Sequence, residues 1–288
     1  MHGADLGLGR ARVTPEAPVG VFDSGLGGLT VAKEIRALLP SESLLYLADT
    51  CHVPYGPRPI NEIRTFALRI MAHLVESGAK AVVAACNMSS AVAIEDARNT
   101  LPVPVIGVIE AGARAALEVH RGGPIGVMAT QGTVTTEAYP RHLHALAPDL
   151  LVHQVACHDF VPLVEAGLEG SPEARAACQR YLHPLISAGC RTVILGCTHY
   201  PFLLPILRAE ASGLVFVDPA AATARQLRDE LAARGLLRRG GRPSDCFLAT
   251  ADPQRLTKGV RRFMGLVTEA RLSHLWDDSL ADGTTRPS

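Results

Sequence analysis

Residues 81–90 read AVVAACNMSS, and residues 192–202 read TVILGCTHYPF. Each stretch is an apolar run of strand length that ends at a cysteine, Cys86 in the first and Cys197 in the second. A small polar residue and a predicted helix follow each cysteine. In open parallel sheets, ligands bind beyond the carboxyl ends of the strands, so both thiols are expected where a ligand would sit.

The repetition gives these two cysteines more weight than a single cysteine would have. Cysteine is among the most often buried residue types, so one cysteine at a strand end is about as often a small apolar side chain as a reactive thiol. A thiol beside a helix N-terminus feels the positive end of the helix dipole, which favours the thiolate. Two such thiols at matching positions indicate a pair that acts on one small substrate.

Strands and helices alternate along the chain, and the pattern restarts near residue 124. Strands are predicted at 19–23, 44–49, 81–85 and 102–108, and again at 124–130, 150–156, 192–196 and 213–218. The first strands of the two sets, starting at Val19 and Ile125, are 106 residues apart, and the two cysteines are 111 apart. Alternation of this kind predicts parallel sheets, and the similar offsets predict an internal repeat.

The predicted fold class is therefore α/β, with two pseudo-symmetric parallel-sheet α/β domains and the active site in the cleft between them. The first domain is predicted over 18–108 plus 219–271 and carries Cys86. The second is predicted over 109–218 and carries Cys197. Residues 219–271 contain a further helix, strand and helix, and they are assigned to the first domain because the strand over 213–218 completes the second.

Both ends of the chain are predicted to lie outside these domains. Residues 1–17 hold Gly, Pro and charged residues, which predicts a flexible N-terminal tail. Residues 272–288 are polar and are predicted to be a disordered tail, with Trp276 as an anchor.

Composition excludes several functional classes. The 288 residues include 28 Lys+Arg and 28 Asp+Glu, so net charge gives no case for nucleic acid or membrane as a partner. Seven cysteines without a CxxC pair favour free thiols in a reducing, cytoplasmic setting over a disulfide scaffold or a zinc cluster. No signal peptide or membrane-spanning stretch is predicted. The three lysines do not follow strand ends in a Gly/Ser-rich context, which argues against a pyridoxal phosphate Schiff base.

A glycine-rich stretch follows the first predicted strand. In DSGLGG, Gly25 and Gly27 supply part of a dinucleotide-binding fingerprint, and Asp49 ends the next strand. Thr30 stands where the third glycine is expected, and Asp23 would repel a pyrophosphate. The glycines could instead let the backbone approach a small anion at a helix N-terminus. Asp23 would then orient a proton or an ammonium group, or it would simply cap the helix.

The ordered set of motifs identifies a family. The segments are VFDSGLGGLTV (21–31), ADTCHVPYG (48–56), AACNMSSA (84–91), PVIGVIEAG (104–112), FVPLVEAG (160–167) and LGCTHYPFL (195–203). In this order and spacing the chain resembles a glutamate racemase of the aspartate/glutamate racemase superfamily, over about residues 18–225. The histidine in CTHYP resembles the glutamate enzymes rather than the aspartate racemases.

This resemblance implies a two-base proton transfer at the substrate Cα that needs no cofactor and no metal. Inverting a carbon requires a base and an acid on opposite faces. The family pattern puts Cys86 on the D-glutamate side, assisted by Asp23, and Cys197 on the L-glutamate side, assisted by His199. Two further acids are catalytic candidates, although each could equally be an ordinary loop or helix acid: Asp49 and Glu165.

The resemblance also implies which residues hold the substrate carboxylates and amino group. Besides Asp23 and His199, they are Ser24, Tyr55, Gly56, Asn87 and Thr198, with Thr130 and Thr133 from the second half. Met88 is a departure, because the family usually has threonine there, and it leaves only its backbone N–H for the substrate. His158 is interpreted as a packed or solvated histidine. The remaining cysteines are interpreted as structural: Cys51, Cys157, Cys178, Cys190 and Cys246.

The family setting implies a cytoplasmic homodimer that supplies D-glutamate for peptidoglycan. Three alternatives stay open at this point. The enzyme could racemise another small acidic amino acid such as aspartate, or the chain could be a non-catalytic carboxylate-binding protein with inert thiols. A dithiol redox role would require the two sulfur atoms to come within disulfide contact.

Overall fold

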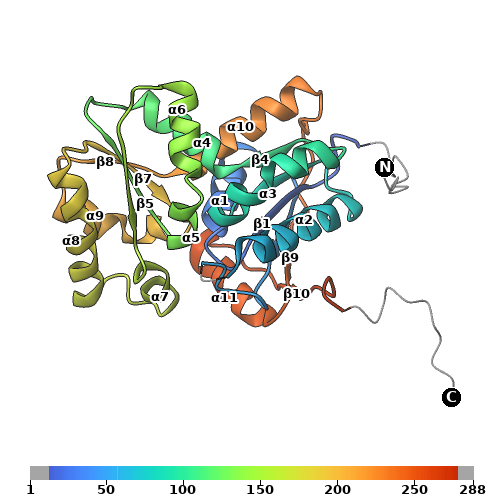
Figure 1. The fold of residues 1–288 in the computed structure, drawn as a ribbon. Coiled ribbons are helices and arrows are strands. Elements are labelled where there is room, and N and C mark those ends of the chain that lie inside the picture. Colours follow the sequence, from blue (N-terminus) through green and yellow to red (C-terminus); the bar gives the residue numbers. More distant parts are fainter. Residues whose placement is uncertain (1–12, 57, 278–288) are drawn as a thin grey trace, which may run out of the picture.

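Two parallel sheets form the framework of the protein. The structure is a computed structural model that describes residues 13–56 and 58–277. A six-stranded sheet has the order β10-β9-β2-β1-β3-β4, and a four-stranded sheet has the order β6-β5-β7-β8 (Figure 1). Every strand pairing in both sheets is parallel. The predicted α/β fold class with two parallel sheets is confirmed.

The two sheets repeat one strand order. The first sheet contains β1 Val19–Asp23, β2 Leu44–Ala48, β3 Ala81–Ala84, β4 Val105–Gly107, β9 Cys246–Ala249 and β10 Arg271–Leu272. The second contains β5 Ile125–Ala129, β6 Val152–Ala156, β7 Thr192–Gly196 and β8 Val215–Val217. The order β2-β1-β3-β4 therefore corresponds to β6-β5-β7-β8. Val19 pairs with Ala81 as Ile125 pairs with Thr192, so the register repeats as well.

Helices connect the strands in each half. Those that connect or follow strands of the first sheet are α1 Leu29–Leu38, α2 Ile60–Glu76, α3 Asn87–Thr100, α4 Val108–Glu118 and α11 Pro253–Met264. Helix α10, Pro219–Ala233, lies between β8 of the second sheet and β9 of the first. Those of the second are α5 Gln131–Thr135, α6 Ala138–Leu146, α7 Phe160–Glu165, α8 Pro172–Ser187, the 3₁₀ helix η1 Tyr200–Leu203 and α9 Leu204–Glu210. None of the helices in residues 13–56 and 58–277 has the length and apolar character needed to cross a membrane.

One apolar core joins the two sheets. Helices α1, α4 and α10 lie between them (Figure 1). Alternation along each strand sends one set of side chains into this shared core, for example Val19 and Val21 from β1 and Ile125 and Val127 from β5. The next side chain along β1, Phe22, belongs to a separate cluster on the outer face of the first sheet. The shared core fixes the two sheets relative to one another.

The structure adds a short helix and corrects one expectation. Residues 131–135 form α5, because the side chain of Thr130 accepts a hydrogen bond from the Thr133 N–H and caps the helix. The disordered tail predicted over 272–288 begins too early. Leu272 belongs to β10 and pairs with Ala249, and the Trp276 Nε1–H donates to Asp49 Oδ1 at 2.8 Å. Residues 278–288, and residues 1–12 of the predicted N-terminal tail, lie outside the described part of the chain.

A buried ion pair lies at the amino ends of two strands of the first sheet. Lys80, which precedes β3, and Glu42, which precedes β2, are both almost completely buried. The Lys80 ammonium donates to a Glu42 carboxylate oxygen and to the backbone oxygens of Pro15 and Leu236. The second Glu42 oxygen accepts the Arg238 N–H at 2.9 Å. These bonds join four segments that are far apart in the sequence.

We expect Lys80→Ala to lower the free energy of unfolding by about 3–5 kcal/mol, because it leaves the Glu42 carboxylate buried without its countercharge. Arg64→Ala is the matched control, since the Arg64–Asp96 pair is exposed and should contribute less than about 1 kcal/mol. Urea unfolding of both variants measures the difference. Equal destabilisation by the two substitutions would contradict the role assigned to the buried pair.

Candidate active site

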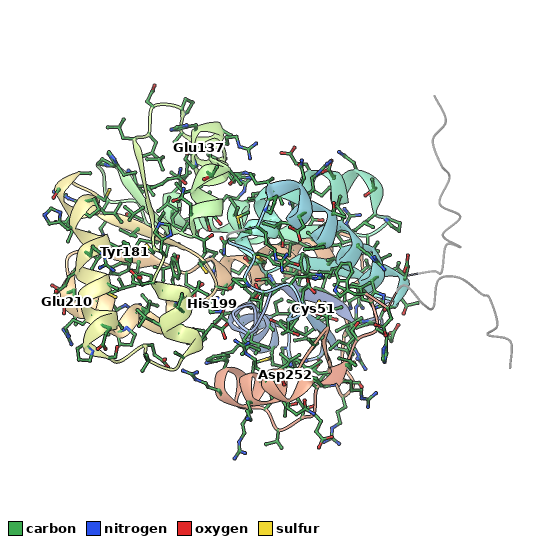
Figure 2. The ribbon with its side chains drawn as sticks, turned by 60° about the horizontal axis from the view of Figure 1, so that its bottom comes forward. Cys51, Glu137, Tyr181, His199, Glu210 and Asp252 are labelled. Atoms are coloured by element: carbon green, nitrogen blue, oxygen red, sulfur yellow. The ribbon has the colours of Figure 1, made fainter. Side chains whose placement is uncertain are left out.

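The candidate site lies where the carboxyl ends of the two sheets face each other. Asp23 ends β1, Cys86 follows β3, Thr130 follows β5 and Cys197 follows β7. These four residues line one cavity of about 420 Å³. Figure 2 shows His199, two residues after Cys197, between the two lobes of the protein.

Most of the residues predicted from the sequence share this cavity. The predicted residues in its wall are Asp23, Ser24, Tyr55, Gly56, Cys86, Asn87, Met88, Thr130, Thr133, Cys197, Thr198 and His199. Asp49 and Glu165 are not in the wall. Each lies directly behind a wall residue, Asp49 behind Tyr55 and Glu165 behind His199, and is hydrogen-bonded to it.

Several further residues line the cavity that were not predicted as site residues from the sequence: Val53, Pro54, Gln131, Cys157, His158, Val161, Pro162 and Gly196. Cys157 and His158 come directly after β6, which ends at Ala156. In the repeated strand order this position corresponds to Asp49, which comes directly after β2. Applying the repeat to every strand end, rather than only to the two cysteines, would have identified these two residues as wall residues.

Cys86 lies in an acidic and enclosed environment. It is the N-cap residue of α3 and only 7% exposed, and its Sγ lies 3.8 Å from the Ser24 hydroxyl oxygen. Burial raises the pKa of the Cys86 thiol to about 11, and the negative charge of Asp23 adds to this effect. Hydrogen bonds from Ser89 and Ser24 lower the pKa but do not offset burial. At neutral pH this sulfur is therefore a protonated thiol that can donate a proton.

Cys197 has a different partner, a histidine. Its Sγ lies 3.8 Å from His199 Nδ1, and His199 Nε2 lies 2.7 Å from Glu165 Oε1. Burial acts to lower the pKa of His199, but hydrogen bonds to Cys197 and Glu165 and their negative charges outweigh it and raise the pKa to about 10. The imidazole is thus positively charged at neutral pH. A cation at this distance is a natural countercharge for a Cys197 thiolate.

Glu165 completes this arrangement. Burial acts to raise the pKa of Glu165, but hydrogen bonds and positive charges from His199 and Arg255 outweigh it and hold the pKa at about 2. One carboxylate oxygen faces His199 and the other pairs with Arg255. Arg255, Glu165, His199 and Cys197 therefore form a row in which each side chain contacts the next.

Asp23 connects the two sides of the cavity. The carboxylate is buried and accepts hydrogen bonds from the Gly25 N–H at 2.9 Å and from the Thr198 hydroxyl at 3.4 Å. Burial raises the pKa of Asp23, although the charge on His199 opposes this. Gly27 accounts for part of the glycine-rich stretch, because a Cβ there would lie 2.2 Å from the Thr198 hydroxyl oxygen and 2.7 Å from His199 Nδ1. The loop after β1 thus approaches the second half of the site through bare backbone.

Asp49 is the centre of a hydrogen-bond cluster outside the cavity. It accepts from the Tyr55 hydroxyl at 2.6 Å, the Thr250 hydroxyl at 2.9 Å and Trp276 Nε1–H. Together with Cys51 and His52, Asp49 forms the one group of three potential metal ligands within the described residues. Both Asp49 oxygens already accept hydrogen bonds. These bonds explain the cluster, because they hold Asp49 in place as the partner of the Tyr55 hydroxyl.

Further contacts surround the cavity, and two of them join the two halves. The Tyr139 hydroxyl donates to Asn87 Oδ1 at 2.8 Å, and this bond leaves the Asn87 amide N–H groups as donors. The hydroxyl oxygens of Thr130 and Thr133 lie 3.1 Å apart. The Met88 side chain packs against Gly132, where an added Cβ would lie 2.7 Å from its sulfur.

Comparisons with known proteins agree with one another. The sequence model of the family described as Asp/Glu/Hydantoin racemase matches residues 29–227. A glutamate racemase from Beutenbergia cavernae is 45% identical over 264 residues, which cover 87% of this chain and 90% of that protein. The solved structure of a glutamate racemase isoform from Bacillus anthracis has a TM-score of 0.85 at 36% identity and covers 90% of this chain and 97% of that one. A glutamate racemase from Francisella tularensis, solved in complex with D-glutamate, has a TM-score of 0.83 at 30% identity and covers 90% and 96%.

We expect alkylation of Cys86 by iodoacetamide to accelerate about tenfold per pH unit between pH 7 and 10, because the thiolate fraction rises in that proportion below the pKa of about 11. Peptide mass spectrometry separates Cys86 from the other cysteines. The exposed Cys51 shows that the reagent is active at each pH. A Cys86 rate that levels off near pH 8 would show that the thiol has an ordinary pKa.

Proposed function

Because this chain belongs to the Asp/Glu/hydantoin racemase family, we propose that it interconverts L-glutamate and D-glutamate by proton transfer at Cα without a cofactor. Racemases are isomerases, so the chain belongs to that enzyme class. The observation that supports this reaction best is that two thiols, carried by different sheets, line one small cavity. A carbon held between them would have an acid or base on each face.

The different surroundings of the two thiols support a different role for each when L-glutamate is bound. With L-glutamate bound, the Cys197 thiolate removes the Cα proton, and the protonated His199 balances the charge that the thiolate carries beforehand. The Cys86 thiol delivers a proton to the opposite face and becomes the thiolate. The product is D-glutamate, no atom is gained or lost, and the reverse reaction starts from the opposite protonation states.

The polar residues of the wall account for binding of a small amino diacid. Asn87 offers amide N–H donors to a carboxylate, because its oxygen is already bonded to Tyr139. Ser24 and Thr198 place hydroxyl groups in the same wall, one from each half. The Tyr55 hydroxyl donates its proton to Asp49, so its oxygen is left to accept from the substrate ammonium group. Thr130 and Thr133 supply further hydroxyl groups from the second half.

The biological setting is part of the same proposal. The enzyme supplies D-glutamate for peptidoglycan, acts in the cytoplasm and works as a homodimer. The relatives named glutamate racemase support the activity on which this setting depends.

The proposal is tested by following the circular dichroism of L-glutamate with purified protein and no added cofactor. The signal should decay to zero as the racemic mixture forms, and dialysis against a chelator should leave the rate unchanged. Retention of the L-glutamate signal, or loss of activity on dialysis that a metal restores, would overturn the proposal. An aspartate assay under the same conditions shows whether the second diacid is a substrate.

We expect Cys197→Ser and Cys86→Ser each to abolish racemisation in both directions, because each residue serves both directions in turn. Elimination separates the two sides, since it needs only one base. From a glutamate carrying chloride on Cβ, the thiolate takes the Cα proton, a Cα–Cβ double bond forms and chloride leaves. Cys197→Ser should still eliminate from the D analogue through Cys86, and Cys86→Ser from the L analogue through Cys197.

The residues that assist the thiols, Asp23 and His199, should likewise affect opposite enantiomers. Asp23→Asn should reduce mainly the elimination from the D analogue, and His199→Asn mainly that from the L analogue. Chloride release, measured for each enantiomer and each single variant, decides the question. Equal loss of both analogues in both cysteine variants would show that the thiols act as one unit, contrary to the two-sided mechanism.

We expect Met88→Thr to lower the KM for glutamate severalfold, because the threonine hydroxyl could bond to a charged group, an interaction of about 1.5–3 kcal/mol. The same substitution removes buried contacts of the Met88 side chain, so the free energy of unfolding should fall by about 1–3 kcal/mol. Steady-state kinetics and urea unfolding measure the two effects separately. A KM that is unchanged or higher in a folded variant would show that the present wall already compensates for the missing hydroxyl.

A further inference from the structure

Helix α11 of the first half reaches across to the candidate site. Arg255 and Arg262 are seven residues apart, or about two helical turns, and therefore lie on one face of the helix. Arg255 pairs with Glu165 at the end of α7, and Arg262 pairs with Glu169, just beyond α7. The ring of Phe263 lies on that of Phe202 with centroids 4.3 Å apart. Figure 1 shows α11 below the junction of the two lobes, near α7.

The two arginine pairs resemble each other but differ in what lies behind them. Both arginines are partly exposed, and both carboxylates belong to the second half. Glu169, which is partly buried, pairs with Arg262, and no hydrogen bond joins it to a described residue of the cavity wall. Glu165 has its second oxygen 2.7 Å from His199 Nε2, and His199 in turn faces the Cys197 sulfur. Arg255 is therefore the outer end of a line that reaches a thiol of the cavity.

We propose that Arg255 is a positioning residue for the Cys197 side of the reaction, acting by fixing the Glu165 carboxylate so that one oxygen stays on His199. This proposal rests on the racemase function proposed above. A guanidinium presents several N–H donors in a rigid plane, so it holds a carboxylate in one orientation better than solvent does. Without it, the partly exposed Glu165 could rotate away, and His199 would lose the bond that fixes its ring.

The proposal makes the Cys197 side depend on contact between the two halves. Arg255 comes from a helix that follows β9 of the first sheet, whereas Glu165, His199 and Cys197 follow strands of the second. The polar groups that contact Cys86 or shift its pKa come from other elements than α11. They are Asp23 at the end of β1, Ser24 in the loop after it, and Ser89 in α3.

Charged groups around Glu165 determine how pH should affect this side. His199 and Arg255 bind the carboxylate directly, and Asp23 and Cys197 face His199 from the cavity. Arg262 and Glu169 form the neighbouring pair. Since His199 and Arg255 hold the pKa of Glu165 at about 2, loss of Arg255 should raise this pKa. A carboxylate that must stay ionised then becomes protonated at a higher pH.

The test compares Arg255→Gln with Arg262→Gln, which removes the neighbouring pair of the same helix, and with Arg255→Lys, which keeps the charge. Racemisation rates cannot distinguish the two sides. The equilibrium constant between L-glutamate and D-glutamate equals one, so a variant must lower kcat/KM equally for both enantiomers. Chloride elimination from the L and D analogues of β-chloroglutamate is therefore measured for each variant from pH 3 to 9, a range that includes the interval between the Glu165 pKa of about 2 and its ordinary value of 4.5.

For Arg255→Gln we expect kcat/KM for the L analogue to fall roughly tenfold or more, as it does when a catalytic group is misplaced. The value for the D analogue should stay within about twofold of the unchanged protein. The acid side of the L profile should move to higher pH. Arg255→Lys should recover part of the loss, and Arg262→Gln should leave both analogues and both profiles unchanged.

Three outcomes would overturn the proposal. They are equal loss of both analogues in Arg255→Gln, equal effects of Arg255→Gln and Arg262→Gln, and no change in the L analogue profile. The cysteine variants separate this failure from failure of the proposed function. If Cys197→Ser and Cys86→Ser show the expected division between enantiomers while Arg255→Gln does not, only the role of Arg255 is wrong.

Discussion

The apolar core shared by the two sheets is the interaction on which the candidate site depends. Helices α1, α4 and α10 fill the space between the sheets, and inward-facing residues such as Val21 and Val127 extend the same core from both sides. This contact sets the carboxyl ends of β1 and β3 opposite those of β5 and β7. Neither sheet alone could place groups on both faces of one carbon. The cavity is therefore a consequence of how the repeats pack.

The same packing gives the two thiols different electrostatic surroundings, although they follow corresponding strands of the repeat. The thiol after β3 is buried beside Asp23, which raises the pKa of Cys86 to about 11. The thiol after β7 has a positively charged imidazole beside it, which Glu165 stabilises. A symmetric pair would offer two acids or two bases. In the proposed racemisation, the different neighbours let one thiol act as the acid and the other as the base, as an inversion at carbon requires.

Support for these groups comes from segments far away in the sequence. Tyr55 is held by Asp49, whose carboxylate is in turn bonded to Thr250 and Trp276 from the end of the chain. Glu165 is held by Arg255 from α11. Among the described residues, none beyond 245 lines the cavity, yet Thr250, Arg255 and Trp276 hold the two carboxylates that are bonded to wall residues. In both cases a carboxylate is the intermediary, because its two oxygens can be bonded to different partners.

Much of this protein could be predicted from local patterns. Apolar runs of strand length end at Cys86 and Cys197, and run length and helical period depend only on neighbouring residues. The repeat therefore determined the parallel sheets and the placement of both thiols at strand ends. Contacts between distant residues decided the rest. The pairing of Arg255 with Glu165 and the anchoring of Trp276 on Asp49 leave no period in the sequence, because the partners meet only when the two sheets and the last strand have packed.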